Sequence, residues 1–540
     1  MRQQYEPSAD RIIALYQQLE DDILSAVIRR ILKMGYVSEA SKHQLEVLQA
    51  AGLLYDDIVQ LIADRTDACT AQVKALFEDA GVQTVAIDNS LHEAAGALPI
   101  DIRQDSSTRQ VLEAGYKKTL GTMRNLVSTT ATQTQTAFIQ TCDRIYMQVS
   151  SGAFSYQEAI MNALRALADT GAEVVYPTKH KDRMDVAVRR CVLTGVSQTA
   201  AAVSLRQAED AGCYLMEITA HSGARPDHAK WQGQLVTITG KDAGKIIDGL
   251  RVFTLSEIGY GSGEGFKGWN CRHNWHAYYP GFSTPNYTPE ELKKLDEPCI
   301  SYNGKLYTEY EVSQMQRAQE RRVRAWKRRC ITAQEGVNSA TDEATNAAAQ
   351  AEYSKSAVHL KANEEKLKDF CKQTGQNRDR FREQVYGFGR SEAQRAVQAN
   401  NSSFRNTMRQ KGIKNPPESI AEFKKMMYNK PDEYKLMQTY SKSVDSGMIS
   451  PLVGYEKYKE YHKRVEKELV GLTTSNGIEI KSQSDHFLER VFGTISDPTH
   501  EGAKRSGVEL EDIAEALKNG SVRQHKNGSY SKIYTELDEP

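Results

Sequence analysis

Two short clusters of histidine, cysteine and tryptophan stand out in the middle of this 540-residue chain. The first, HSGARPDHAKWQG, carries His221 and His228, and the second, GWNCRHNWHAYYPG, carries Cys271 and His273. Alternate residues of an extended segment lie on one face, so Cys271 and His273 can share one ligand. Zn²⁺ takes four nitrogen or sulfur ligands in a tetrahedron. The two clusters therefore predict a structural zinc site at His221, His228, Cys271 and His273.

A metal-free arrangement of the same clusters is the alternative. In it, Arg225 and Asp227 pair with the loop backbone, and three tryptophans fill a core: Trp231, Trp269 and Trp275. A catalytic zinc is a third possibility. It normally keeps a carboxylate base beside an open coordination position, and Asp227 is the acid that the first cluster offers. The residue pattern leaves all three possibilities open.

The segment that carries both clusters must fold tightly enough to bring them together. Residues 213–219, CYLMEIT, have strand propensity. Glycine and proline are frequent from there to about residue 289, which indicates turns. We therefore predict a compact α+β module at 213–300, small enough to gain stability from a metal clasp.

Helical periodicity dominates the N-terminal side and predicts a mainly α body at 1–212. The pattern at 107–150 is rich in Thr, Gln and Ser and has few large apolar residues, so we expect it to pack against a partner protein or another copy. At 10–34 the apolar stripe is clear: Ile12, Tyr16, Leu19, Ile23 and Val27, ended by Gly35. Further helical patterns cover 40–66, 68–80, 155–170 and 182–212.

Helical patterns return at 301–398, where the sequence is first basic and then rich in Ala, Glu and Lys. The basic stretch at 316–329 contains RRVRAWKRR, whose cations can neutralise phosphates and so contact DNA. The alternative is a helical surface whose cations pair with carboxylates. Residues 399–475 contain NNSS and NPPES, which predict a linker, followed by a charged helix at 455–471.

The composition of the whole chain narrows the class of protein. The 70 basic and 70 acidic side chains give no net charge and no general attraction to nucleic acid or membrane. The sequence has no run of about 18 apolar residues, so we expect no membrane partner and no bilayer span. Its first residues are charged, unlike a signal peptide. The eight cysteines are scattered singly, which suits a reducing compartment.

The two clusters also carry a resemblance to a known family. GARPDHAKWQG followed by GWNCRH resembles the phage minor capsid protein 2 family, which is grouped with the Mu-type head morphogenesis proteins. The basic stretch and FCKQTGQNRDRFR are similar to the family's downstream region, so the resemblance covers about 1–385. By position, it extends the zinc assignment to His228, Cys271 and His273. Mu-type relatives often have cysteine pairs where this chain has Arg225 and His228.

The resemblance implies a structural protein of a phage or prophage virion, assembled in the bacterial cytoplasm. It implies a place at the portal vertex, a role in head assembly or DNA delivery, and portal and other capsid proteins as partners.

Residues 476–540 predict a small α+β domain. Helical patterns cover 484–493, with Ser484 as the N-cap, and 506–520. SVRQHKNGSYSKIYT then predicts a β-hairpin that turns at Asn-Gly. Three polar residues share one face of the first helix: His486, Glu489 and Arg490.

This order of elements resembles the bacterial polymorphic toxin type 50 domain, which is assigned to the barnase, colicin and RelE-like ribonuclease fold. The resemblance implies a metal-independent endoribonuclease that acts on RNA without a cofactor. A histidine can exchange protons near neutral pH, while lysine and arginine stabilise charge on the phosphoryl oxygens. The matching residues, which are the expected catalytic residues, are Lys481, His486, Arg490, Ser529 and Lys532.

One departure from the toxin domain keeps two alternatives open. The sequence ends after one hairpin, where members of that family continue into at least one more strand. The shorter sheet would make this copy inactive or dependent on a strand from a partner. Beside a capsid protein with an appended ribonuclease, the alternatives are a polymorphic toxin delivered by a capsid-like body and a purely structural protein with an inactive C-terminal domain.

Overall fold

The structure of the chain, a computed structural model, consists of two compact units, residues 1–396 and 397–540. The residues that the structure describes are 2–492 (without 97, 103 and 177), 507–524 and 530–533.

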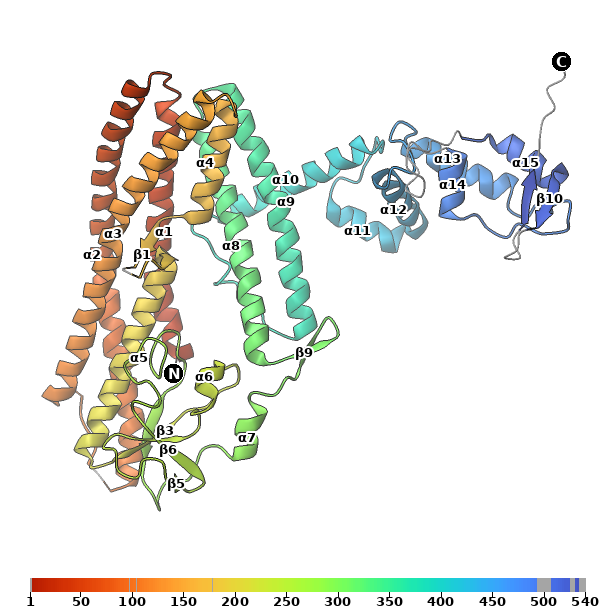
Figure 1. Cartoon of the computed structure of the whole chain (residues 1–540). Helices are drawn as coiled ribbons and strands as arrows, with labels where there is room; N and C mark the ends of the chain where they lie inside the picture. The colour runs from red at the N-terminus through yellow and green to blue at the C-terminus, as the bar shows by residue number, and fades with distance from the viewer. Residues whose placement is uncertain are drawn as a thin grey trace. The chain divides into compact units, whose positions relative to one another are not determined.

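The first unit is a bundle of long helices with a small sheet near one end (Figure 1). The mainly helical body predicted from the sequence is confirmed by these helices. Their bounds are α1 (Arg2–Met34), α2 (Ala40–Ala94), α3 (Ser106–Ser150), α4 (Tyr156–Thr170), α5 (Met184–Asp210), α6 (Pro226–Ala229), α7 (Pro289–Lys294), α8 (Glu309–Ser339) and α9 (Glu343–Thr374).

Helices α1, α2, α3 and α5 pack against one another, and α8 packs on α1 and pairs with α9. The predicted apolar stripe of α1 is its buried face, and Gly35, with a φ of +65°, follows the end of the helix. Helix α2 is continuous where the sequence predicts a break after residue 66. Thr66 and Cys69 are both buried there, so packing keeps the backbone helical through a segment of weak helix propensity.

Helix α3 buries its apolar residues inside this chain, so the expectation that they need a partner protein is wrong. Met123, Val127 and Phe138 are fully buried in the core that α3 shares with α1, α2 and α5. The polar residues do not prevent this packing, because hydroxyls such as Thr130 bond to the carbonyl one turn earlier in the same helix.

The module after α5 is built on a five-stranded sheet with the order β5-β6-β4-β3-β7. β4 and β6 are parallel, and the other neighbours are antiparallel. The predicted strand at 213–219 forms the buried strand β3. The sheet strands are β3 (Leu215–Ile218), β4 (Leu235–Thr237), β5 (Ile246–Ile247), β6 (Leu250–Thr254) and β7 (Trp275–Tyr278); two separate hairpins are β1 (Glu173–Val175) with β2 (Lys181–Arg183), and β8 (Ile300–Tyr302) with β9 (Lys305–Tyr307).

The basic stretch of α8 contributes to a buried network of ion pairs. Arg324 pairs with Asp185 of α5, and Arg328 lies 3.8 Å from Glu20 of α1 and 3.7 Å from Asp185. Arg329 reaches Asp169 at 2.6 Å. These contacts favour the alternative in which the cations of this stretch pair with carboxylates.

The second unit contains helices in the region 399–475, for which the sequence predicts a linker followed by a charged helix. Side chains from five of its helices and the segments between them form one core, which includes Ile413, Met437, Tyr440, Tyr458 and Leu488. The predicted charged helix at 455–471 is α13. The helices and strands are α10 (Arg390–Gln410), α11 (Ile420–Asn429), α12 (Pro431–Asp445), α13 (Tyr455–Glu468), α14 (Asp485–Val491), α15 (Leu510–Asn519), β10 (Ser521–Gln524) and β11 (Tyr530–Ile533).

The predicted hairpin is the antiparallel pair β10–β11, whose turn lies outside the described residues. Ser484 caps α14 as predicted, by accepting a hydrogen bond from the backbone N–H of Phe487. Among the described helices, none is long and apolar enough to cross a bilayer.

Candidate functional site

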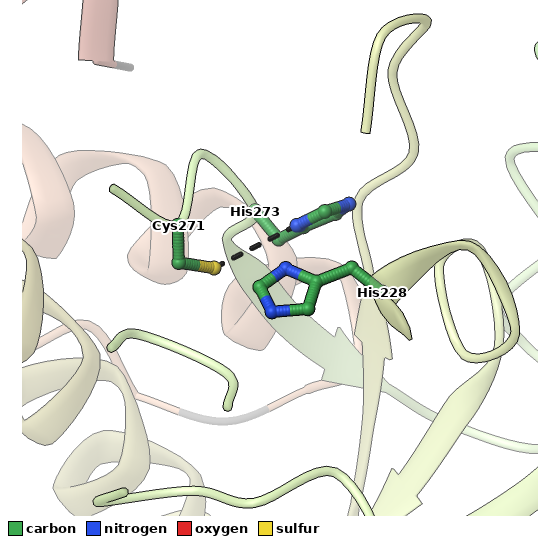
Figure 2. Close-up of side chains that lie close together, drawn as sticks. All are labelled: His228, Cys271 and His273. Carbon is green, nitrogen blue, oxygen red and sulfur yellow. Dashed lines mark hydrogen bonds between the residues drawn. The ribbon is translucent and has the colours of Figure 1, made fainter. Parts of the chain in front are cut away.

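Three of the four predicted metal ligands converge inside the sheet module (Figure 2). His228 lies on the short helix α6, which begins at Pro226. Cys271 and His273 lie in the segment just before β7. One ligand atom from each residue lies within 4.8 Å of the other two, and all three side chains are buried.

The hydrogen bonds around the two imidazoles orient one nitrogen of each toward the cysteine. His273 Nε2 lies 3.3 Å from Gln232 Oε1, and His228 Nε2 lies 2.8 Å from the backbone oxygen of Glu264. When the Nε2–H of His273 donates to Gln232, its Nδ1 keeps the lone pair. At His228, the Glu264 oxygen favours the same tautomer, whereas the Arg225 guanidinium, 2.6 Å from Nε2, can only donate and favours the other. His273 Nδ1 lies 3.6 Å from Cys271 Sγ, and a ring nitrogen of His228 faces the same sulfur in Figure 2.

Burial favours the neutral form of both imidazoles, which is the form that binds metals. Burial, with a further contribution from the nearby His221 and His228, lowers the pKa of His273 to about 2. Burial also lowers the pKa of His228. A zinc ion at about 2.0–2.3 Å from tetrahedral ligands separates neighbouring ligand atoms by roughly 3.5 Å. The distance between Cys271 Sγ and His273 Nδ1 fits this spacing.

His221 lies beside these three residues but outside the converging set. Its ring centre is 4.4 Å from that of His273, and its Nδ1 is 2.8 Å from the backbone oxygen of Ser222. The three-residue set therefore leaves one position of a tetrahedron for a further ligand.

Parts of the predicted metal-free arrangement are also present. Arg225 donates to the Glu264 carbonyl and lies 2.6 Å from His228 Nε2. Two of the tryptophans fill the core as predicted, because Trp231 and Trp275 are 2% and 1% exposed. The expectation for Trp269 is wrong, since its side chain is 50% exposed on the loop that precedes Cys271.

The carboxylate of Asp227 does not stand where a catalytic base would be needed. It is 3.4 Å from Arg225 and 3.9 Å from Nε2 of His228, the nitrogen on the Glu264 side of the ring. The Nδ1 atoms that could bind a metal lie on the other side. The arrangement therefore suits a structural metal better than a hydrolytic one.

Sequence reasoning missed the oxygens that hold the two imidazoles. Gln232 follows Trp231 in the first cluster, so its amide could have been predicted to form a hydrogen bond with one of the nearby imidazoles. The Glu264 contact comes from a backbone carbonyl, which leaves no trace in residue type.

The second candidate site is the polar face of α14. His486 Nδ1 lies 2.9 Å from Glu489 Oε2, and Arg490 Nε donates to His486 Nε2 at 3.0 Å. His486 and Arg490 are exposed. Glu489 also accepts a hydrogen bond of 2.6 Å from Ser443 of α12, so it joins two helices.

Among the described residues, no hydrogen bond or ion pair joins the other expected catalytic residues to this face. Lys481 is exposed at the edge of a hollow of about 690 Å³ between α12, α13 and the segment before α14. Lys532 lies in β11 opposite Val522. Ser529 lies outside the described residues.

Comparisons with known proteins agree on one kind of protein. A family profile described as "Phage minor capsid protein 2" matches residues 2–372. A "Structural protein" of Lactococcus phage LL-H is 23% identical over 333 residues, which cover 59% of this chain and 86% of the relative. A "Structural protein" of Lactococcus phage mv4 is 37% identical over 81 residues, 15% of this chain and 57% of the relative. The comparison with solved structures found no match.

Proposed function

We propose that this chain, which belongs to the phage minor capsid protein 2 family, is a structural protein of the virion. We further propose that a zinc ion links two segments of its middle module. The family match includes both the helical bundle and the module. The observation that supports the zinc ion is the convergence of His228, Cys271 and His273 on one buried point.

The ion would join two segments that lie far apart in the sequence. Nδ1 of His228 and His273 and the thiolate of Cys271 are the proposed ligands, with His221 or water in the fourth position. Gln232 and the Glu264 carbonyl would hold the imidazoles in the correct tautomer, as outer hydrogen-bond acceptors do in many metal sites. The ion supplies a rigid link and no catalytic step.

Metal analysis of the purified full-length protein tests the zinc proposal. We expect about one zinc per chain, and a chelator should lower the melting temperature. If the protein contains no metal, and neither chelator nor added zinc changes its melting temperature, the clasp is the hydrogen-bonded one.

We further propose that the protein acts at the portal vertex, in head assembly or DNA delivery, with portal and other capsid proteins as partners. The support is the family itself, together with two phage relatives that are described as structural proteins. Antibody labelling of purified virions should mark a single vertex. Labelling spread over the whole shell would contradict this position, and absence from virions would favour a toxin with a capsid-like body.

A ribonuclease activity of the C-terminal domain is the second candidate function. The contacts of His486 with Glu489 and Arg490 support it, because they fix an imidazole beside a cation on an exposed helix face. Lys481, Ser529 and Lys532 are the further residues that the toxin resemblance assigns to it.

Cleavage of RNA by the full-length protein in the presence of EDTA tests this activity. His486→Ala should lower the rate by about 10²–10⁴. His180→Ala, which removes an exposed histidine of the first unit, should not change it. Intact RNA after incubation with the folded wild-type protein would assign the C-terminal domain a purely structural role.

A further inference from the structure

Trp269 is a large aromatic side chain held on the surface by a braced loop. It is 50% exposed, and the guanidinium of Arg190 lies 5.6 Å from its ring centre. Two residues before Trp269 in the sequence, the buried Lys267 donates hydrogen bonds to Asn274 Oδ1 at 2.8 Å and to Ser197 Oγ at 3.3 Å. After Trp269, the backbone continues into the buried Cys271. The part of the indole that Arg190 and the neighbouring loop leave open to solvent can contact a ligand.

A hollow of about 630 Å³ lies beside Trp269, between α3 and α5. Three cations line it: the exposed Lys118, the buried Lys267, and Arg190, which pairs with Asp182 outside the lining. Several threonine and tyrosine hydroxyls complete the lining. No described carboxylate is part of this lining. Lys118 is exposed, and its ammonium forms no ion pair with a carboxylate of the described residues. The hollow therefore suits an anionic ligand that also accepts hydrogen bonds.

Arg190 also lines a second hollow, of about 260 Å³, to which α1, α5, α8 and the loop after Trp269 contribute. The carboxylates in its lining are Asp185 and Glu320, which are both buried. Phe381 adds a ring to the lining, 6.0 Å below the Arg189 guanidinium. Arg324, which pairs with Asp185, also lines it. The other arginines of the lining are Arg189, Arg272, Arg317, Arg321 and Arg382.

The positive charge of the second hollow is only partly compensated. Arg189 and Arg382 pair with Asp10 and Asp379 at its edge. Arg321 is exposed and forms no ion pair with a carboxylate of the described residues. Arg190 lines both hollows and Trp269 lines the first, and we call the linings of the two hollows together the Trp269 surface.

We propose that the Trp269 surface binds single-stranded nucleic acid, with a base stacked on the indole and phosphates beside Lys118, Arg190 and Arg321. Bases of any identity stack on aromatic rings, and basic grooves follow the backbone of a single strand. A duplex hides its base faces, so it would leave Trp269 unused. An acidic peptide would satisfy the cations but offers no flat ring to the indole.

This inference goes beyond the proposed structural role, which assigns no ligand to this surface. It also differs from the DNA contact predicted for the helix at 316–329. Most arginines at the end of that helix are used in ion pairs, and only its first part reaches the Trp269 surface.

Binding of a labelled 20-nucleotide oligothymidylate to the full-length protein, followed by fluorescence anisotropy, tests the proposal. DNA is used so that any ribonuclease activity has no effect. Trp269→Ala should weaken binding about tenfold, the scale of one stacked base, and Trp269→Phe should keep most of the affinity. Phe282→Ala removes another exposed ring of the same module and should have no effect.

A neighbouring pair of lysines provides the control for charge. Lys118→Ala should reduce the salt dependence of binding by about 0.7 in the slope of log K against log salt. Lys117→Ala should not, because Lys117 is absent from the lining and pairs with Glu113 at 2.7 Å. Both lysines are exposed, so neither variant should affect folding.

Three results would overturn the proposal. They are an oligonucleotide that does not bind at low salt, a Trp269→Ala variant that is folded and binds like the wild type, and polyglutamate that competes as well as DNA. The last result would assign the surface to an acidic protein partner instead.

Discussion

At the scale of single residues, two neighbouring aspartates of α1 have opposite surroundings. Burial and the adjacent Glu20, opposed by Arg328, together raise the pKa of Asp21 to about 8. Asp22 is 37% exposed and pairs with Arg65 at 3.0 Å. The folded protein therefore keeps a proton on Asp21 that the unfolded chain releases above its ordinary pKa of about 4.

This difference predicts that Asp21→Asn raises the thermal stability of the protein by an amount that depends on pH. Because the pKa is raised in the folded state, the stability that protonated Asp21 contributes is complete below about pH 4 and is lost as the pH rises toward 8. An amide has no proton to lose, so the variant should melt at a higher temperature than the wild type at pH 8 and at a similar one at pH 4. We expect a difference on the order of 1–3 kcal/mol at pH 8.

Asp22→Asn is the matched control for this prediction. This variant removes the ion pair with Arg65 and does not replace a buried, protonated carboxyl group. It should therefore not raise the melting temperature at pH 8. Equal gains for Asp21→Asn at pH 4 and pH 8 would show that the carboxyl is not protonated in the folded protein.

Cys271 and Cys299 provide a second comparison at this scale. Cys271 is buried beside His273, and Cys299 is exposed. Cys271→Ser should lose the bound metal and about 2–5 kcal/mol of stability, as expected when a structural link is removed. Cys299→Ser should keep both, as measured by metal content and calorimetry. Loss of metal from the Cys299 variant alone would place the site elsewhere.

At the scale of elements, α3 and α5 come closest where each contributes a glycine. A Cβ on Gly195 would stand 2.1 Å from Oγ1 of the buried Thr119, and a Cβ on Gly115 would stand 2.0 Å from Oγ1 of Thr199. Two short β-branched side chains thus fill the space above two glycines. Because the two helices lie this close, the few apolar residues of α3 are buried although no long side chains fill the space between the helices.

This close approach predicts opposite effects for two glycine substitutions. Gly195→Ala should destabilise the protein by about 1–3 kcal/mol, because the helices must separate or Thr119 must move. Gly121→Ala, at an exposed position of α3 with nothing within 4 Å of the new Cβ, should stabilise it by up to about 1 kcal/mol. Thermal unfolding of the two variants measures both effects. A neutral Gly195→Ala would mean that the helix contact is loose.

The same elements show what the sequence could and could not predict. The stripe of α1 and the strand β3 follow from local periodicity, and the residue types of the two clusters indicated that His228, Cys271 and His273 meet. The burial of α3 could not be predicted, because it depends on glycines of two helices that face each other. The exposure of Trp269 could not be predicted either, since burial depends on what covers a loop. In the stretch predicted as a linker, NNSS lies within α10 and NPPES marks only the turn before α11.

At the scale of the whole molecule, the first unit is complete only with α8 and α9. Glu20 and Asp185 are 1% and 3% exposed, and α8 supplies Arg324 and Arg328 to them. A carboxylate left buried without its partner costs about 3–5 kcal/mol. The helices before the module therefore depend on residues that follow it.

This dependence predicts different behaviour for two fragments. Residues 1–396 should be soluble and unfold cooperatively, since they contain one compact unit. Residues 1–300 should aggregate or unfold at neutral pH, because the buried carboxylates lose their arginines and α1 and α4 lose the helix that covers them. Size-exclusion chromatography and circular dichroism distinguish the two. A stable 1–300 fragment would show that the ion pairs are dispensable.

The pairing of Asp185 with Arg324 also sets an order of events during translation. The two residues are 139 positions apart, so at about 5–20 residues per second the ribosome makes the arginine about 7–28 s after the aspartate. During that interval Asp185 has no Arg324 to pair with. Because burying an unpaired carboxylate is costly, we expect the N-terminal helices to finish packing only afterwards. A virion protein built in this way exposes its finished bundle to assembly partners only after the module has already been synthesised.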